Sequence, residues 1–206
     1  MKFEVSEIFH SIEGETKTAG FPAIFVRLTG CNLNCRYCDS RHALTNGDRM
    51  GIAEIKLAVD KLSPAHHVTL TGGEPLLQKG AAKLIDSLCS WGHSLQIETN
   101  GSLPLKGLNK TARLIVDVKT PSSGAGGSFL MENLNWLRPD DELKFVVCSE
   151  GDYLFAREFI ASNKPGATVN LSPAAGLGRK KLAGWMLRDK LNARFNLQLH
   201  KIIGTR

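Results

Sequence analysis

Three cysteines stand close together in one short segment of the chain, Cys31-Asn-Leu-Asn-Cys35-Arg-Tyr-Cys38. Thiolates at this spacing can hold one metal centre from a single loop. A [4Fe–4S] cluster held by three thiolates leaves one iron open, and an open iron can bind a small molecule. A structural zinc site uses four protein ligands. The chain offers three candidates for that fourth ligand, namely His42, Cys89 and Cys148.

A second motif, Thr71-Gly72-Gly73-Glu74-Pro75, follows a predicted strand and precedes a predicted helix. Adjacent glycines let the backbone approach a ligand closely, and the Glu74 carboxylate can accept from a bound ammonium group. Taken alone, the motif is equally typical of an ordinary tight turn between a strand and a helix.

Acidic and basic residues of a third group lie before the cysteines. Glu13 and Glu15 belong to the segment 9–15, and Arg27 lies on the predicted strand that leads into the cysteine loop. Carboxylates accept paired hydrogen bonds from an aminopyrimidine edge, and Arg holds a carboxylate through two parallel bonds. The group indicates a substrate that has both an aminopyrimidine-like edge and a carboxylate. Composition alone favours a solvated turn at Glu13–Glu15 and a surface Arg.

The elements that must position these motifs alternate along the chain. Apolar, β-branched runs predict strands at Phe3–Ile8, Ala23–Thr29, His67–Thr71, Leu95–Thr99, Arg113–Val118, Leu143–Cys148, Thr168–Leu171 and Phe195–His200. Helical periodicity between them predicts helices within 52–62, 77–88, 153–161 and 180–191.

Strand–helix alternation predicts parallel strands with right-handed crossovers. A closed eight-fold barrel typically needs about 250 residues, and this chain has 206. We therefore expect a single α/β domain over residues 1–206, built as a partial barrel of about six mostly parallel strands. The active site of such a fold lies at the carboxyl ends of the strands. Five polar segments directly follow predicted strands, namely 29–31, 71–75, 98–101, 117–119 and 200–201.

Composition narrows the class of protein. Hydrophobic content of 42% and charged content of 22% are ordinary for a soluble domain. The acidic first residues and the absence of a long apolar run predict a cytoplasmic protein without a membrane partner. Five cysteines, three of them clustered, fit a reducing compartment better than a disulfide framework. We interpret Cys89 and Cys148 as buried, inert thiols.

The net charge of +6 is unevenly distributed. Residues 179–206 carry eight Lys and Arg against one acid, Asp189. This basic stretch is typical of a solvated helix face, and it could also dock an acidic electron-donor protein. No aromatic residues are interleaved with it in a way that favours nucleic acid.

The C-x3-C-x2-C spacing, with an aromatic just before the last Cys, resembles the radical S-adenosylmethionine (SAM) superfamily. Further motifs resemble the 7-carboxy-7-deazaguanine synthases over almost the whole chain. They are Ser-Ile-x-Gly-Glu at 11–15, Arg27, Thr-Gly-Gly-Glu-Pro at 71–75, Glu-Thr-Asn-Gly at 98–101 and Gln-Leu-His-Lys at 198–201.

The resemblance implies a radical SAM enzyme that converts 6-carboxy-5,6,7,8-tetrahydropterin to 7-carboxy-7-deazaguanine with loss of ammonia, in 7-deazapurine (queuosine precursor) biosynthesis. It implies a [4Fe–4S] cluster, SAM and Mg²⁺ as cofactors, a homodimer, and a flavodoxin- or ferredoxin-like electron donor. The rival interpretations are another small radical SAM enzyme, such as a glycyl-radical activating enzyme, a non-catalytic Fe–S protein, or a zinc-binding module.

Site residues follow from the same resemblance. The cluster ligands would be Cys31, Cys35 and Cys38, and the Mg²⁺ ligand Ser40. SAM would contact Tyr37, Cys38, Asp39, Gly73, Glu74, Asp117, Val118 and Lys119. The pterin would contact Ile12, Glu13, Gly14, Arg27, Thr71 and Arg206.

Two of these positions depart from the family pattern. Many family members have Thr where this chain has Ser40, and many have Gln where it has Glu13. Serine offers the same oxygen, whereas a charged Glu changes the hydrogen-bond pattern toward the substrate. At the C-terminus, His200 closes the last predicted strand, and we expect His200 and Arg206 to lie at the active-site rim.

Overall fold

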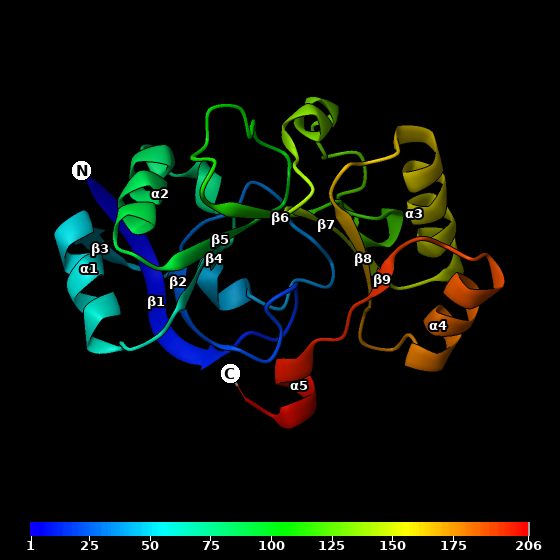
Figure 1. Ribbon diagram of the computed structural model, residues 1–206, viewed down its shortest axis with the longest axis horizontal. Helices are drawn as coiled ribbons and strands as arrows, with labels where there is room; N and C mark the ends of the chain where they lie inside the picture. The colour runs from blue at the N-terminus through cyan, green and yellow to red at the C-terminus, as the bar shows by residue number, and fades with distance from the viewer. Residues whose placement is uncertain (206) are drawn as a thin grey trace.

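One curved sheet of nine strands organises the computed structural model, which describes residues 1–205 (Figure 1). Its order is β3-β1-β2-β4-β5-β6-β7-β8-β9. The strands are β1 (Lys2–Ile12), β2 (Pro22–Leu28), β3 (Asp48–Gly51), β4 (His67–Gly72), β5 (Ser94–Thr99), β6 (Arg113–Asp117), β7 (Glu142–Val147), β8 (Thr168–Pro173) and β9 (Arg194–Phe195). From β2 to β9 all neighbours pair in parallel, whereas β1 is antiparallel to both β2 and β3.

Helices cover the convex face of this sheet, and loops fill its curve (Figure 1). The α-helices are α1 (Ile52–Lys61), α2 (Ala81–Ser90), α3 (Glu150–Asn163), α4 (Arg179–Arg188) and α5 (Leu199–Ile203). Short 3₁₀ helices span Arg41–Leu44, Pro75–Leu77, Pro121–Ser123 and Met131–Trp136. Helices α1 to α4 lie outside the arch, and α5 lies at its open side. In residues 1–205 no helix is both long and apolar enough to cross a membrane.

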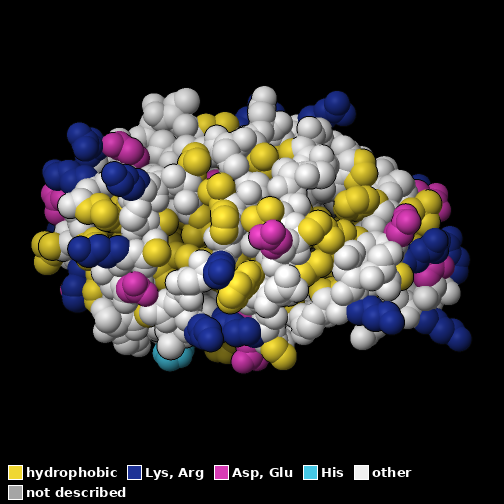
Figure 2. Space-filling model, turned by 90° about the horizontal axis from the view of Figure 1, so that it is seen from above, with side chains coloured by type: hydrophobic (Ala, Val, Ile, Leu, Met, Phe, Trp, Pro, Cys, Tyr) yellow, Lys and Arg dark blue, Asp and Glu magenta, His cyan; other side chains and the backbone are white. Residues whose placement is uncertain are grey.

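The main hydrophobic core lies between the sheet and the outer helices. Ile24, Leu70 and Leu143 from the strands and Ile55 and Ile85 from the helices are all fully buried there. Burial of apolar area at about 25 cal/mol per Å² is the main favourable term in folding such a layer. Seen from above, Lys and Arg lie mostly around the rim of the molecule, and more hydrophobic side chains lie toward its middle (Figure 2).

The concave face of the sheet is polar. Polar residues alternate along the parallel strands, so that Thr69, Gln96, Glu142 and Asn170 are buried inside the arch. They hydrogen-bond to one another: Gln96 Nε2 donates to Thr69 Oγ1 over 3.0 Å, and Asn170 Nδ2 donates to Glu142 Oε2 over 2.6 Å. Asn170 Oδ1 has no partner within residues 1–205. Buried polar groups need such partners, and the interior is therefore a hydrogen-bonded network.

The predicted α/β partial barrel with mostly parallel strands is confirmed, and the sheet is open because β3 and β9 are its edges. Seven strands are parallel where about six were expected. The edge strand β3 was not predicted, because four residues carry little periodicity. Helix α2 begins at Ala81 and not near Leu77, because Gly80 adopts the left-handed conformation with φ +88°.

The predicted strand Phe195–His200 is wrong. Only Arg194 and Phe195 pair with β8, and the chain then leaves the sheet to form α5. The cause is a non-local contact, since Leu199 N donates to Gly14 O over 2.7 Å. The alternating apolar residues of this segment therefore lie on a short helix and its lead-in.

The predicted N-terminal strand Phe3–Ile8 extends to Ile12 and contains a β-bulge between Val5 and Glu7. Before the bulge, Val5 packs into the main core. After it, Ile8 packs against that core, and Glu7 and Phe9 line the cavity inside the arch. One irregularity thus reverses which face each side chain occupies, as bulges do.

Candidate active site

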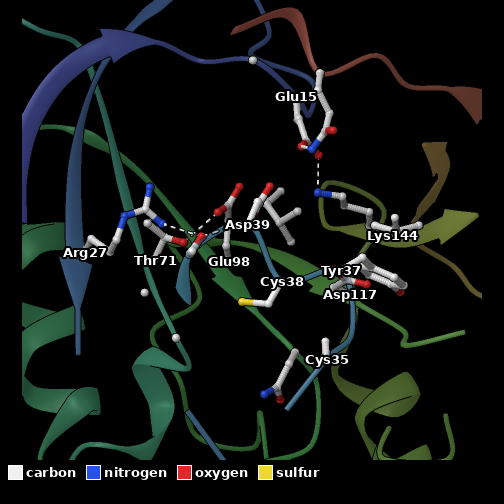
Figure 3. A pocket seen from close by; sticks show the side chains of 18 of the residues that line it. Glu15, Arg27, Cys35, Tyr37, Cys38, Asp39, Thr71, Glu98, Asp117 and Lys144 are labelled. Atoms are coloured by element: carbon white, nitrogen blue, oxygen red, sulfur yellow. Dashed lines mark hydrogen bonds and ion pairs between the residues drawn. The ribbon is translucent and has the colours of Figure 1, made fainter. Parts of the chain in front are cut away.

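A cavity of about 880 Å³ lies inside the arch, at the carboxyl ends of the parallel strands (Figure 3). Most of the predicted site residues line it. They are Ile12, Glu13, Gly14, Arg27, Cys31, Cys35, Tyr37, Cys38, Asp39, Ser40, Thr71, Gly73, Asp117 and Lys119. Glu74 and Val118 do not line it, and Arg206 lies outside the described residues.

The cysteine loop leaves the end of β2 and turns into the cavity. Cys35 is buried, whereas Cys31 and Cys38 are half-buried, and all three are free thiols. The backbone N of Leu33 lies 3.4 Å from Cys31 Sγ, and Asn100 Nδ2 lies 3.8 Å from it. Hydrogen-bond donors around a sulfur suit a thiolate bound to iron.

These observations bear on which metal centre fits. Three thiols reach one cavity from a single loop, and two donors already point at one of the sulfurs. That donor set fits a [4Fe–4S] cluster with one open iron. Within residues 1–205 no three His, Cys, Asp or Glu side chains are gathered closely enough to hold a single metal ion.

The glycine pair after β4 lets two loops approach each other. Glu74 N donates to Gly30 O over 2.8 Å, and a Cβ added at Gly73 would come within 2.9 Å of Cys31 Cβ. Real Cβ atoms do not approach so closely, so position 73 must be glycine for the loop after β4 to pack on the cysteine loop.

Glu74 itself is fully buried. Its carboxylate accepts from Thr99 Oγ1 at 2.9 Å, Asn100 N at 2.7 Å and Leu76 N at 2.9 Å, which ties the turns after β4 and β5 together. Val118 is likewise buried, in the main core. The direct contacts of both residues with SAM stay predictions, and the structure gives Glu74 a bracing role beneath the cavity wall.

Asp117 and Lys119 form an ion pair that also lines the cavity. Lys119 Nζ lies 2.8 Å from Asp117 Oδ2, and although burial opposes the charge, the carboxylate raises the pKa of Lys119 above its ordinary value. Asp117 Oδ1 is buried and has no hydrogen-bond partner in residues 1–205. An unpartnered buried acceptor is costly and fits a ligand hydroxyl such as that of a ribose.

Ser40 joins Arg27 to Asp39. Arg27 NH1 lies 3.4 Å from Ser40 Oγ, and Ser40 Oγ donates to Asp39 Oδ1 over 3.1 Å. Lys201 Nζ lies 2.8 Å from Asp39 Oδ2. Partial burial by itself would raise the pKa of Asp39, but hydrogen bonds from Lys201 and Ser40 outweigh it and lower that pKa to about 2. A guanidinium, a hydroxyl and a carboxylate thus converge at one rim of the cavity.

Glu13 lies deeper, with 2% of its surface exposed. Its carboxyl group accepts from Thr69 Oγ1 at 2.9 Å, from Glu15 N at 3.2 Å and from Gln96 Nε2. Burial, with the negative charge of Glu98 nearby, raises the pKa of Glu13 to about 8. Glu13 therefore lines the cavity as a largely protonated acid braced by the protein.

Lys144 and Glu98 line the cavity, and neither was singled out from the sequence as a site residue. Lys144 pairs with Glu15, and Thr71 Oγ1 donates to Glu98 Oε2 over 2.8 Å (Figure 3). Burial raises the pKa of Glu98, whereas the pKa of Lys144 is raised by Glu15 despite burial. A signal was present in the sequence, because polar residues alternate with apolar ones along the strands that hold these side chains.

Glu7 and Phe25 also line the cavity, and no motif pointed to them. Phe9, the first residue of the segment 9–15, lines it as well. Cys148 also lines the cavity. Cys148 and Cys89 are both half-buried, so the prediction that they are buried thiols is wrong.

The C-terminal segment closes one side of the cavity. His200 lines it, as expected, although it does so from α5 and not from a strand end. Gln198 Nε2 donates to Glu15 Oε1 over 2.7 Å, which fixes the lead-in to α5. Burial lowers the pKa of His200, so the imidazole is disposed to be neutral.

Comparison with known proteins places this geometry in a family. Residues 25–124 match the Radical SAM superfamily. The chain is 42% identical to the 7-carboxy-7-deazaguanine synthase of Koribacter versatilis, over 98% of this chain and 97% of that protein. It is 41% identical to the synthase of Methanospirillum hungatei, over 98% and 85%.

Solved structures agree with this assignment. QueE from Escherichia coli superposes with a TM-score of 0.80 at 25% identity, over 97% of this chain and 95% of that chain. Streptococcus suis SuiB bound to S-adenosylmethionine, at 14% identity and a TM-score of 0.58, covers 82% of this chain and 48% of its own, and shares the fold alone. The sequence identity and its coverage show that this chain belongs to the 7-carboxy-7-deazaguanine synthase family of the radical SAM superfamily.

Proposed function

We propose that this enzyme converts 6-carboxy-5,6,7,8-tetrahydropterin to 7-carboxy-7-deazaguanine, with a [4Fe–4S] cluster and SAM as cofactors and with loss of ammonia. One observation carries the proposal beyond family membership. A single cavity is lined by three cysteines on one wall, by Arg27 and Ser40 at its rim, and by carboxyl groups in its interior. The cysteines match the cofactors, Arg27 and Ser40 match the carboxylate of the substrate, and the interior carboxyl groups match its aminopyrimidine edge.

The residues present suit the family cofactors. Cys31, Cys35 and Cys38 would hold the cluster, which when bound supplies the electron that starts radical chemistry on SAM. Asp117 offers a buried, unpartnered oxygen to a ligand hydroxyl, and Tyr37 lies nearby, its pKa raised to about 12 by burial. These residues bind and orient, while the cofactor carries the difficult chemistry.

The substrate pose follows from charge. Arg27 would bind the carboxylate on C6 of the pterin, because a guanidinium matches a carboxylate bidentately. Glu15 and Glu98, which both line the cavity, would accept from the aminopyrimidine edge. The predicted contacts of Ile12, Glu13, Gly14, Thr71 and Arg206 with the pterin belong to the same pose.

We place Mg²⁺ at Ser40. Mg²⁺ prefers oxygen ligands and is typically shared between protein and substrate. Ser40 Oγ lies between Arg27 and Asp39, so an ion there would meet the same substrate carboxylate that Arg27 binds. The ion would fix the pose of that carboxylate and stabilise developing charge.

From family membership we also propose that the enzyme is a homodimer and that an acidic flavodoxin- or ferredoxin-like protein reduces it. The basic stretch 179–206 supports the acidic electron donor, because Lys180 and Lys181 at the start of α4 are exposed to solvent. Attraction of this kind weakens with salt, so turnover driven by the protein donor should fall with ionic strength more than turnover driven by a small reductant.

The test is anaerobic incubation of reconstituted enzyme with 6-carboxytetrahydropterin, SAM, Mg²⁺ and a reductant, with product identified by mass. We expect 7-carboxy-7-deazaguanine in an amount that exceeds the SAM consumed, because SAM is regenerated in the proposed reaction. Stoichiometric loss of SAM without pterin conversion would instead favour another radical SAM activity.

A further inference from the structure

Glu7 and Arg27 face each other directly across the antiparallel pair of β1 and β2. Arg27 Nε lies 2.7 Å from Glu7 Oε1, and the side chains are only 16% and 14% exposed. The bulge between Val5 and Glu7 is what brings Glu7 onto the cavity face, because without it the side chain would face the helix layer.

The guanidinium is held from two further sides. Its Cζ lies 5.7 Å from the centre of the Phe9 ring, which stacks on Phe25 with centroids 5.0 Å apart. Its NH1 lies 3.4 Å from Ser40 Oγ. A guanidinium is planar and rigid, so contacts at Nε, at NH1 and on one face fix the plane in which it can meet a carboxylate.

Glu7 is itself anchored to the loop that carries Ser40. His42 Nε2 lies 3.1 Å from the same oxygen, Glu7 Oε1, that Arg27 Nε contacts. The Glu7 carboxylate therefore joins the strand that bears Arg27 to the short helix Arg41–Leu44, which directly follows Ser40.

We propose that Glu7 is a positioning residue for substrate recognition, which holds the Arg27 guanidinium aimed at the carboxylate on C6 of the pterin. The inference rests on the proposed function. An Arg side chain that is free to rotate loses conformational entropy when it binds a ligand, whereas one already fixed does not. Glu7 should therefore strengthen recognition of the carboxylate and leave recognition of the ring unaffected.

The test compares two ligands on matched variants. Equilibrium binding of 6-carboxytetrahydropterin and of a tetrahydropterin without the carboxyl group is measured by calorimetry on anaerobic protein. The variants are Glu7→Ala, the isosteric Glu7→Gln, Arg27→Ala and the double variant. Glu4→Ala is the control, because Glu4 lies on the same strand and pairs with Arg49 over 3.2 Å at the exposed surface.

We expect Glu7→Ala to weaken binding of the carboxylated ligand by about tenfold, or ~1.4 kcal/mol, and to leave the ligand without the carboxyl group within about twofold. Glu7→Gln keeps the shape and one acceptor oxygen, so it should weaken binding of the carboxylated ligand by about threefold, less than Glu7→Ala does. Adding Glu7→Ala to Arg27→Ala should have no further effect, because the residue that Glu7 positions is gone. Glu4→Ala should bind both ligands as the unaltered chain does.

Equal weakening of both ligands, or no weakening of either, would overturn the proposal, as would additive effects in the double variant. If Glu7→Ala does not fold, the Glu7→Gln comparison decides in the same way. Failure of the proposed function looks different, because the unaltered chain would then show no preference for the carboxylated pterin and form no product from it.

Discussion

The imidazole of His200 lies against the backbone of Gly14, in the space that a side chain at position 14 would occupy. Leu199 N donates to Gly14 O beside it. Two segments almost 190 residues apart in the sequence thus form one wall of the cavity, and this contact is the reason that the chain leaves the sheet after Phe195.

Gly14→Ala should displace α5 from that wall. The added methyl would overlap the His200 ring, and overpacking of this kind costs about 1–3 kcal/mol. We expect a lower Tm and a KM for the pterin raised by roughly tenfold, with SAM cleavage in the absence of substrate retained. Gly184→Ala is the control, because nothing lies within 4 Å of a Cβ there, and it should stabilise α4 slightly. An unchanged KM for Gly14→Ala would make α5 irrelevant to the substrate.

The three-ligand cluster can be tested by iron and sulfide content. Replacement of Cys31, Cys35 or Cys38 by Ala should abolish the cluster and SAM cleavage, because each removes one of the three proposed ligands. Cys89→Ala and Cys148→Ala should retain both. Cys148 is the more stringent control, since it also lines the cavity. Loss of iron from Cys148→Ala would mean that the cluster has a fourth protein ligand.

Ser40→Ala should raise the Mg²⁺ concentration needed for half-maximal turnover by about tenfold or more, equivalent to at least ~1.4 kcal/mol. The hydroxyl oxygen is the proposed ligand, so Ser40→Thr should retain the response. SAM binding should be the same in all three proteins. If Ser40→Ala responds to Mg²⁺ as the unaltered enzyme does, the ion binds elsewhere.

Glu13 should make the folded chain less stable as the pH rises. Its pKa is about 8 in the folded chain against an ordinary 4.5, so the folded chain keeps a proton that the unfolded chain releases. The stability contributed is present below about pH 4.5 and is lost as the pH rises toward about 8. Glu13→Gln should reduce the difference in unfolding free energy between pH 5 and pH 8 by at least ~1.4 kcal/mol, one pKa unit.

Urea unfolding at the two pH values measures that difference. Glu132→Gln, on an exposed carboxyl of the Met131–Trp136 segment, is the control and should leave the pH dependence unchanged. If the unfolding free energy changes by the same amount between pH 5 and pH 8 in Glu13→Gln and in the unaltered chain, the pKa of Glu13 is not raised.

Local sequence signals predicted most of the fold and the cofactor end of the site. Strands such as His67–Gly72, the cysteine spacing and the Gly72-Gly73 pair all carry their structural role in neighbouring residues. What could not be predicted depends on distant contacts. The bulge beside Glu7 lengthens the apolar spacing from two residues before Val5 to three after it, which in the sequence looks the same as the end of a strand. The turn into α5 depends on Gly14.

The polar interior lies between these cases. Lys144 stands two residues after Glu142 on a strand whose other residues are apolar, so both charged side chains lie on the same face of the sheet. Read on one strand, this pattern indicates only a half-exposed edge. It acquires its meaning when Thr69, Gln96 and Asn170 on neighbouring strands are seen to face the same interior.

The central claim is that one cavity holds SAM and the pterin together, with C6 of the pterin facing the SAM end. Incubation of the enzyme with SAM and substrate deuterated at C6 tests it most directly, with mass spectrometry of the adenosyl group of SAM. We expect deuterium in that adenosyl group, with less transfer in Arg27→Ala because the carboxylate is no longer held. Pterin conversion without any deuterium in the adenosyl group, or SAM cleavage that is indifferent to the pterin, would contradict the account.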